Sequence, residues 1–285
     1  MFSTLDMSIK IRNQNLAAFS LIEMIAVLSI IGLLVTIFTV GTSIRYSAAV
    51  RSTIREVIQY KISIYNFSDT YKSLPGDSIN IQKFWPAACS STGASTEPKY
   101  DCHGDGDDII EDYISGKSLN ESLLAWKQLK IPQIIDGSFS GAGDGANPTQ
   151  SINVNVPKSK FPKGQYAILH HHDTNFPDEH MIILGKAHAG TIGDTKLLEG
   201  TYANNIDNKL DDNLPSSGIV YARNGHNGTD YSSNCLLDAS DDPASNSEAI
   251  DQTLQYNLEL RSAECILGFV ITQAELINPS RSAVD

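Results

Sequence analysis

The feature that most constrains this chain is an uncharged, apolar stretch near its N-terminus. No charged residue occurs between Glu23 and Arg45, a run of 21 residues. An α-helix of that length extends about 31 Å, and the hydrocarbon core of a bilayer is about 30 Å thick. The run therefore predicts a single transmembrane helix. Lys10 and Arg12 precede it with little acidic opposition, which predicts a cytoplasmic N-terminus and a body on the far side of the membrane.

Two other interpretations of this stretch are a secretory signal peptide and a plain single-pass anchor. The run is longer than the apolar region of an ordinary signal. Its only weak cleavage sequence, Ser47-Ala48-Ala49, follows Arg45, where a neutral segment is expected. A carboxylate at Glu23 is also unusual in a signal peptide, so both alternatives are disfavoured.

Glu23 needs a partner if it lies at membrane depth. An isolated carboxylate there costs about 2.5–3.5 kcal/mol on insertion scales, and the helix dipole offsets only part of that cost. If the chain is cut before Phe19, the new α-amine lies four residues from Glu23. The amine of one helix can then meet the carboxylate of the next. Such a contact is heterologous and propagates as a helical filament.

The start of the apolar stretch resembles the prepilin cleavage and methylation motif of type IV pilins and type II secretion pseudopilins. It reads Ala18-Phe19-Ser20-Leu21-Ile22-Glu23, and the resemblance extends over residues 16–44. It implies that a prepilin peptidase cuts between Ala18 and Phe19, that Phe19 becomes methylated, and that Glu23 guides assembly. The family usually has glycine before the cut, whereas this chain has Ala18.

The same resemblance implies a non-enzymatic structural subunit, minor rather than major because of its size, of a type IV pilus or a type II secretion pseudopilus. A pseudopilin would push exoproteins outward, and a minor pilin would serve adhesion, motility or DNA uptake. The implied partners are other pilin or pseudopilin subunits, the prepilin peptidase, an inner-membrane assembly platform and the lipid bilayer. The implied location is the bacterial inner membrane, with a single pass, a cytoplasmic N-terminus and a periplasmic head, and then the filament. The alternative from another class is a membrane-tethered extracytoplasmic binding protein that does not assemble.

The charge of the chain is uneven. The net charge is −12, and residues 1–18 contribute +1 from Lys10, Arg12 and Asp6, which leaves −13 for the remainder. An acidic body repels phosphate backbones, so nucleic acid is not expected as a partner. Hydrophobic residues make up 41% and charged residues 19% of the chain, which is typical of a folded protein.

The expected fold is α+β, with a long N-terminal helix packed on an antiparallel-sheet head that carries large loops. Ile54, Ile58, Ile62 and Tyr65 form one apolar stripe on the continuing helix, and Leu74-Pro75-Gly76-Asp77 ends it. The expected segments are a leader (1–18), a transmembrane and assembly helix (19–44), its extracytoplasmic continuation (45–74) and the head (75–285). In the head, short apolar runs predict strands at Tyr166–His170, Met181–Leu184, Ile219–Ala222 and Ile266–Thr272, and helices are expected at Glu121–Lys130 and Thr201–Asp211.

The four cysteines, Cys89, Cys102, Cys235 and Cys265, all follow the apolar stretch. An even number in one compartment indicates disulfides. Three pairings are possible, and the pairs Cys89–Cys102 and Cys235–Cys265 are favoured because each joins neighbours along the chain. Buried free thiols or a metal site are the alternatives, although no Cys-x-x-Cys pair supports zinc.

An acidic segment could bind calcium. Asp101, Asp105, Asp107 and Asp112 fit positions one, five, seven and twelve of a loop of EF-hand type, but His103 occupies the third position. A solvated acidic turn held by Cys102 is the alternative. No cofactor is required by the sequence, and calcium is a possible ligand.

Two further groups carry weaker signals. Asp207 and Asp211 share a helix face at i, i+4, where a cation, Lys209 or plain solvent would face them. His170 and His172 point the same way on a strand, but a clear third ligand is missing. Neither a Gly-x-Ser-x-Gly elbow nor a phosphate-binding loop nor a His-Glu-x-x-His pair occurs, so an enzyme is not expected.

Overall fold

The computed structural model describes residues 20–86, 102–111, 121–141, 152–170, 176–187, 193–226, 234–237 and 254–271, without the side chains of 38–43. The chain divides into two compact units, Met1–Arg45 and Tyr46–Asp285, and each is considered by itself. The predicted cleavage site at Ala18 and Phe19 lies outside the described residues, as do Cys89, Asp101 and Asp112.

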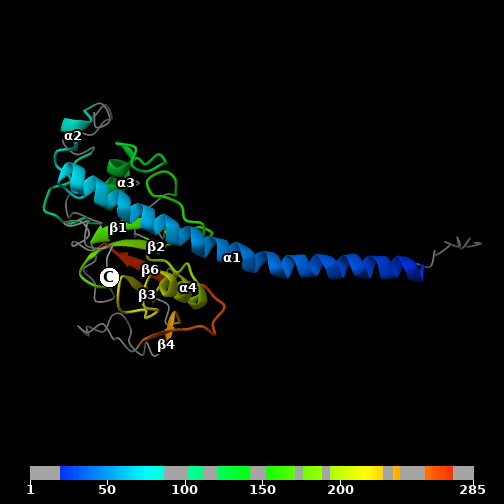
Figure 1. Cartoon of the computed structure of the whole chain (residues 1–285). Coiled ribbons are helices and arrows are strands. Elements are labelled where there is room, and N and C mark those ends of the chain that lie inside the picture. Colours follow the sequence, from blue (N-terminus) through cyan, green and yellow to red (C-terminus); the bar gives the residue numbers. More distant parts are fainter. Residues whose placement is uncertain are drawn as a thin grey trace, which may run out of the picture. The chain divides into compact units, whose positions relative to one another are not determined.

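The fold is α+β with an antiparallel sheet, as predicted (Figure 1). The helices are α1 (Leu21–Tyr71), α2 (Ile81–Phe84), α3 (Glu121–Lys130) and α4 (Gly200–Leu210). The strands are β1 (Gln165–His170), β2 (His180–Gly185), β3 (Val220–Asn224), β4 (Leu236–Leu237), β5 (Gln255–Tyr256) and β6 (Cys265–Val270). The predicted helices and strands of the head are confirmed, with ends that differ by no more than two residues. The short elements α2, β4 and β5 are additions.

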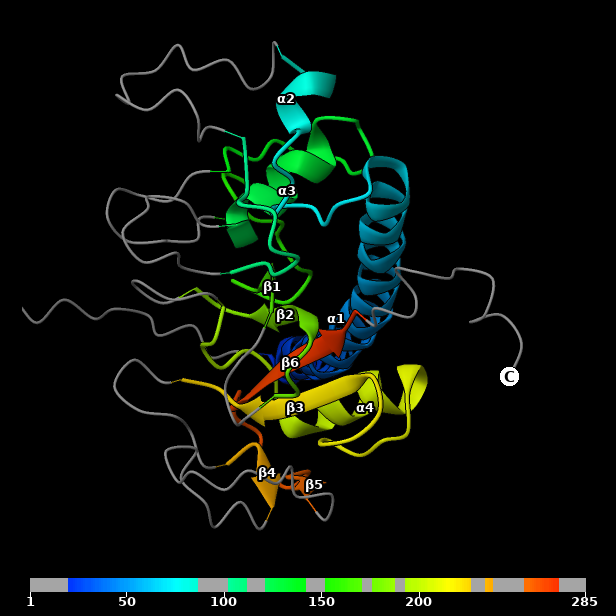
Figure 2. The ribbon, with the colours of Figure 1, turned by 90° about the vertical axis from the view of Figure 1, so that its left-hand side faces the viewer.

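The main sheet has the strand order β1-β2-β6-β3, and β4 and β5 form a separate pair (Figure 2). One row of paired residues, Tyr166–Leu184–Leu267–Ala222, crosses all four strands of the main sheet. All four side chains are buried and belong to the larger apolar core. The apolar runs of this sheet are continuous rather than alternating because both of its faces are covered.

The larger core lies between one face of the sheet and the helices. From the turns of α1 after Tyr46 it contains Val57, Ile64 and Phe67, and from α3 it contains Trp126 and neighbouring leucines. The ring of Tyr60 makes edge contacts with Trp126 and with Tyr166 of β1. Aromatic pairs of this kind contribute about 0.5–1.5 kcal/mol beyond their buried area.

The opposite face of the sheet carries a second, smaller apolar core. It is built from Leu169, Met181, Ile183, Ile266 and neighbouring residues. At the centre of this face lies Gly268, where an added Cβ would collide with Met181 and approach the ring of Phe176. A side chain at this position would therefore require Met181 and Phe176 to shift.

The face of α1 that packs on the head differs from the predicted one. Val50, Val57 and Ile64, spaced seven residues apart, are buried, whereas Ile58 and Ile62 of the predicted stripe are 44% and 54% exposed. Two apolar stripes run along this helix, and only one of them faces the sheet. The prediction that the Ile54–Tyr65 stripe supplies the packing is therefore wrong for Ile58 and Ile62.

The first unit contains the apolar part of α1. Within the described residues, none of the helices combines the length and the apolar character that a bilayer crossing needs. The predicted localisation, a single pass through the inner membrane with a cytoplasmic N-terminus and a periplasmic head, is therefore wrong.

Candidate functional site

The most unusual surface of the described chain is the start of α1. We call Leu21–Ile37 the apolar segment. Its large apolar side chains are all about half exposed or more, up to 78% for Leu21: Leu21, Ile22, Met24, Ile25, Val27, Leu28, Ile30, Ile31, Leu33, Leu34, Val35 and Ile37. Monomeric soluble proteins rarely expose contiguous apolar patches larger than a few hundred Å². This surface therefore requires a partner.

The few polar groups of the apolar segment are directed back to the helix. Ser29 Oγ donates to Ala26 O at 2.8 Å, and Thr36 Oγ1 donates to Gly32 O at 2.8 Å. Neither hydroxyl therefore needs a partner from outside. Glu23, in the first turn, is the single charged residue of the segment. Its carboxylate thus marks one end of an otherwise apolar surface.

A second candidate site is a buried acidic cluster in the head. Asp77, in the turn after α1, is 1% exposed, and its carboxylate accepts N–H bonds from Gly106 at 2.6 Å, Asp107 at 3.1 Å and Asp108 at 3.1 Å. This turn is part of the predicted helix stop, Leu74-Pro75-Gly76-Asp77. The side chain of Asp77 thus holds the acidic loop that the sequence singled out.

Glu121, the first residue of α3, completes this cluster. It is fully buried and accepts N–H bonds from Asp105 at 2.9 Å and Glu111 at 3.4 Å. Burial raises the pKa of Asp77 to about 6. Burial and a hydrogen bond with the Glu111 side chain raise the pKa of Glu121 to about 9, so Glu121 carries a proton at neutral pH.

The carboxylates of this cluster lie at cation-binding distances. Ligand oxygens of Asp77, Asp105 and Glu121 lie within 4.8 Å of one another, and so do those of Asp105, Asp107 and Glu111. Asp105 and Asp107 were predicted from the sequence. Asp77 and Glu121 were missed because they are distant in the sequence. The backbone N–H groups that bond Asp77 and Glu121 already balance much of the negative charge of these carboxylates, so the cluster does not require a cation. Calcium binding stays a prediction.

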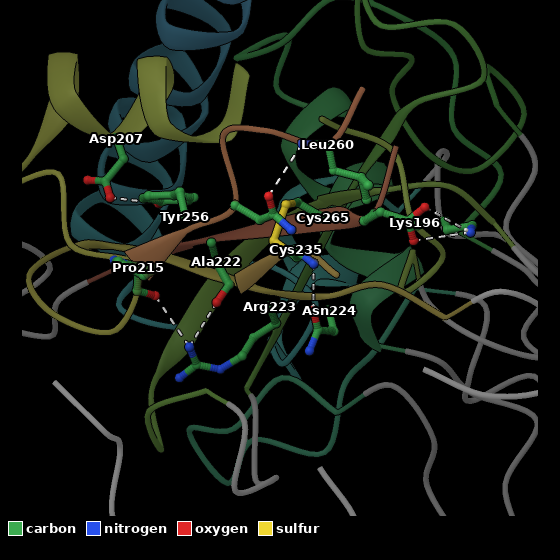
Figure 3. The surroundings of a disulfide bond; sticks show 12 residues. Lys196, Asp207, Pro215, Ala222, Arg223, Asn224, Cys235, Tyr256, Leu260 and Cys265 are labelled. Carbon is green, nitrogen blue, oxygen red and sulfur yellow. Dashed lines mark hydrogen bonds and ion pairs between the residues drawn. A yellow bond between two sulfur atoms is a disulfide. The ribbon is translucent and has the colours of Figure 1, made fainter. Parts of the chain in front are cut away.

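A third acidic group joins the end of α4 to β5. Asp207 is fully buried and accepts a hydrogen bond from Tyr256 Oη at 2.6 Å, a contact shown in Figure 3. Burial, with smaller contributions from Asp211 and Asp212, raises the pKa of Asp207 to about 7. The carboxylate of Asp211 is occupied by the N–H groups of Ile219 and Val220. Asp211 follows the last residue of α4, so it does not lie on the helix face predicted for it, and its carboxylate instead stabilises the connection from α4 to β3.

The single histidine of β1, His170, lies beside a histidine of β2. His170 pairs with His180 in the β1–β2 register, and their ring centroids lie 4.6 Å apart. His170 Nδ1 lies 3.6 Å from Asp178 Oδ1. The predicted partner His172 lies outside the described residues.

A disulfide between Cys235 and Cys265 confirms one predicted pair and ties the β4 region to the first residue of β6 (Figure 3). Cys235 N–H also donates to Asn224 Oδ1 at 2.9 Å. Cys102 is disulfide-bonded as well, and its predicted partner is Cys89. Nearby, Arg223 Nη1 donates to Ala222 O at 2.8 Å, and burial lowers the pKa of Arg223 to about 10.

Comparison with protein-family models, with curated proteins and with solved structures gives no match.

Proposed function

We propose that this chain is a structural subunit of a filament of the type IV pilus or type II secretion pseudopilus kind. The observation that carries the proposal is the apolar segment, a helical surface with large exposed apolar side chains and one carboxylate at its start. The resemblance of residues 16–44 to the prepilin motif supports the same function.

The energetics favour association of this segment with other helices. Burying a Leu or Ile side chain fully contributes about 1.5–3 kcal/mol, so covering the exposed part of each contributes about 1 kcal/mol. The 12 large apolar side chains would together contribute about 10 kcal/mol or more. Association costs about 4–15 kcal/mol, so contact on one side of the helix is marginal. Contact on several sides, as in a filament core, is strongly favourable.

Glu23 gives this association a direction. A carboxylate covered by apolar side chains must be paired with a cation or hydrogen-bonded. In the prepilin motif the partner is the α-amine created by cleavage before Phe19, on a neighbouring subunit. Donor and acceptor stand at different positions of each chain, so the contact repeats from subunit to subunit and does not close on itself.

The experiment is incorporation of Glu23 variants into filaments in the native cells. Glu23→Ala and Glu23→Gln both remove the charge, and we expect both to lower the amount of this subunit in sheared filaments while its amount in the cell is unchanged. Glu259→Gln, an exposed carboxylate of the head, is the matched control. Normal incorporation of both Glu23 variants would show that this carboxylate does not direct assembly.

A further inference from the structure

A groove on the outer side of α1 in the head unit has no occupant in the described part of the chain. Its volume is about 380 Å³, and it is lined by Arg55, Ile58, Gln59, Ile62, Ser63, Asn66 and Ile134. Six of these residues follow one face of α1, and Ile134 follows α3. Ile58 and Ile62, half exposed, form its apolar floor. This is the second stripe of α1, the one that does not face the sheet.

The polar groups of the groove are arranged unevenly. Ser63 Oγ donates to Gln59 O at 2.7 Å, so the centre of the groove presents no free hydroxyl. Arg55 stands at the N-terminal end of the groove and is exposed. Among the described residues, no carboxylate forms an ion pair with Arg55. The groove is therefore an apolar trough with a cation at one end.

We propose that the groove binds the apolar segment of a second copy of this chain, with Glu23 of that copy beside Arg55. The apolar segment has the complementary arrangement, with apolar side chains along its length and a carboxylate at its start. The inference rests on the proposed function and adds the surface that receives the helix. It also gives Glu23 a second cationic partner besides the α-amine of Phe19.

The spacing of the side chains sets the direction and the register. From Arg55 the groove residues on α1 follow at steps of 3, 4, 7, 8 and 11. The same steps from Glu23 reach apolar positions only: Ala26, Val27, Ile30, Ile31 and Leu34. A parallel alignment with an offset of 32 residues thus brings apolar side chains over Ile58 and Ile62 while the two charges meet.

The opposite direction does not fit. If the two helices ran antiparallel with Glu23 beside Arg55, the residues before Glu23 would lie over Ile58, and the apolar segment would extend away from the groove. A parallel contact between different surfaces of two copies is heterologous, so each copy can give its apolar segment to one neighbour and its groove to another. The groove therefore extends the chain of contacts that a filament requires.

The test uses cysteine cross-linking between two full-length copies with different tags, expressed together in the native cells. One copy carries Val27→Cys and the other Gln59→Cys, both at exposed positions. Disulfide-bonded dimers joining both tags are expected at several times the yield of the control pair, Val27→Cys with Asp69→Cys, since Asp69 is exposed on α1 but does not line the groove. Equal yields from the two pairs, or cross-linking of the Gln59→Cys copy mainly to another protein, overturn the proposal.

A charge variant separates this inference from the proposed function. Arg55→Glu places two carboxylates together, so it should lower incorporation into filaments about tenfold, whereas Arg55→Lys should retain most of it. Arg51→Glu is the matched control, because Arg51 is exposed on α1 outside the groove. Normal incorporation of Arg55→Glu, together with a defect of Glu23→Ala, refutes the groove and leaves the proposed function standing. Normal incorporation of Glu23→Ala refutes the role of Glu23 in assembly.

Discussion

Replacement of Asp207 by asparagine should make the head markedly less sensitive to pH. Asp207 is fully buried, and its environment raises its pKa from 3.8 to about 7. A group whose folded-state pKa is raised binds more protons in the folded than in the unfolded chain. Its contribution to stability is therefore complete below about pH 4 and is lost as the pH rises through about 7.

The size of the effect follows from the two pKa values. At pH 5 the Asp207 carboxyl of the unfolded chain is already almost fully ionised, whereas that of the folded chain still holds its proton. The folded chain loses this proton between pH 5 and pH 8. Linkage gives a loss of about 2 to 3 kcal/mol in the free energy of unfolding over this interval. Asparagine carries no charge at either pH and can still accept the hydrogen bond of Tyr256. In Asp207→Asn this part of the pH dependence should therefore be absent.

The assay is urea unfolding of the full chain at pH 5 and at pH 8, followed by fluorescence. Wild type should lose more stability between the two values than Asp207→Asn, by about 2 to 3 kcal/mol. Asp136→Asn removes the same charge at an exposed position and serves as the control. Equal losses in wild type and Asp207→Asn would refute the raised pKa and the burial argument behind it.

Three further predictions concern the head. Reduction of the Cys235–Cys265 bond, or the paired change to serine, should lower the free energy of unfolding by about 3 to 4 kcal/mol, given a sequence separation of 30, and an unchanged urea midpoint would contradict this. Glu121→Gln should fold normally and lose less stability than wild type between pH 7 and pH 10. The pKa of Glu121 is raised to about 9, so the wild type loses stability as this carboxyl ionises. Parallel stability profiles of the two proteins against pH would contradict the raised pKa. If the acidic loop binds calcium, the ion at 100 times its dissociation constant should stabilise the head by about 2.7 kcal/mol. Asp105→Asn and Asp107→Asn should each abolish this stabilisation. A melting temperature that does not change on addition of calcium would contradict the site.

Local patterns predicted the elements of the head well. The helix α3 was found from its apolar spacing, with both ends correct, because its leucines and Trp126 recur at helical spacing within ten residues. The four strands of the main sheet were found from apolar runs between turn residues. Their order and register depend on pairings such as Leu184 with Leu267, which are distant along the chain, and no local pattern contains them.

The packing face of α1 shows where such reasoning fails. Ile58 and Val57 are neighbours with nearly equal apolar character, yet Val57 is buried and Ile58 is half exposed. The choice between two apolar stripes is made by the surface of the sheet, which the helix sequence does not encode. The stripe left over is the floor of the proposed groove.

The residues of the candidate sites also divide into those that a local sequence pattern reveals and those that only the fold brings together. Asp105 and Asp107 were found because acidic residues alternate with glycine over a few positions. Asp77, Glu121 and Tyr256 were missed, since they reach their sites through long-range contacts. The turn at Pro75 and Gly76 was the one available signal for Asp77, and it indicated only the end of the helix.

The central claim, that this chain is a processed filament subunit, is tested most directly by mass spectrometry of its N-terminus after isolation from native cells. We expect the filament fraction to contain a chain beginning at Phe19, with a methylated α-amine and without residues 1–18. A working protein that keeps those 18 residues would contradict the account, because the α-amine proposed to meet Glu23 would then not exist at Phe19.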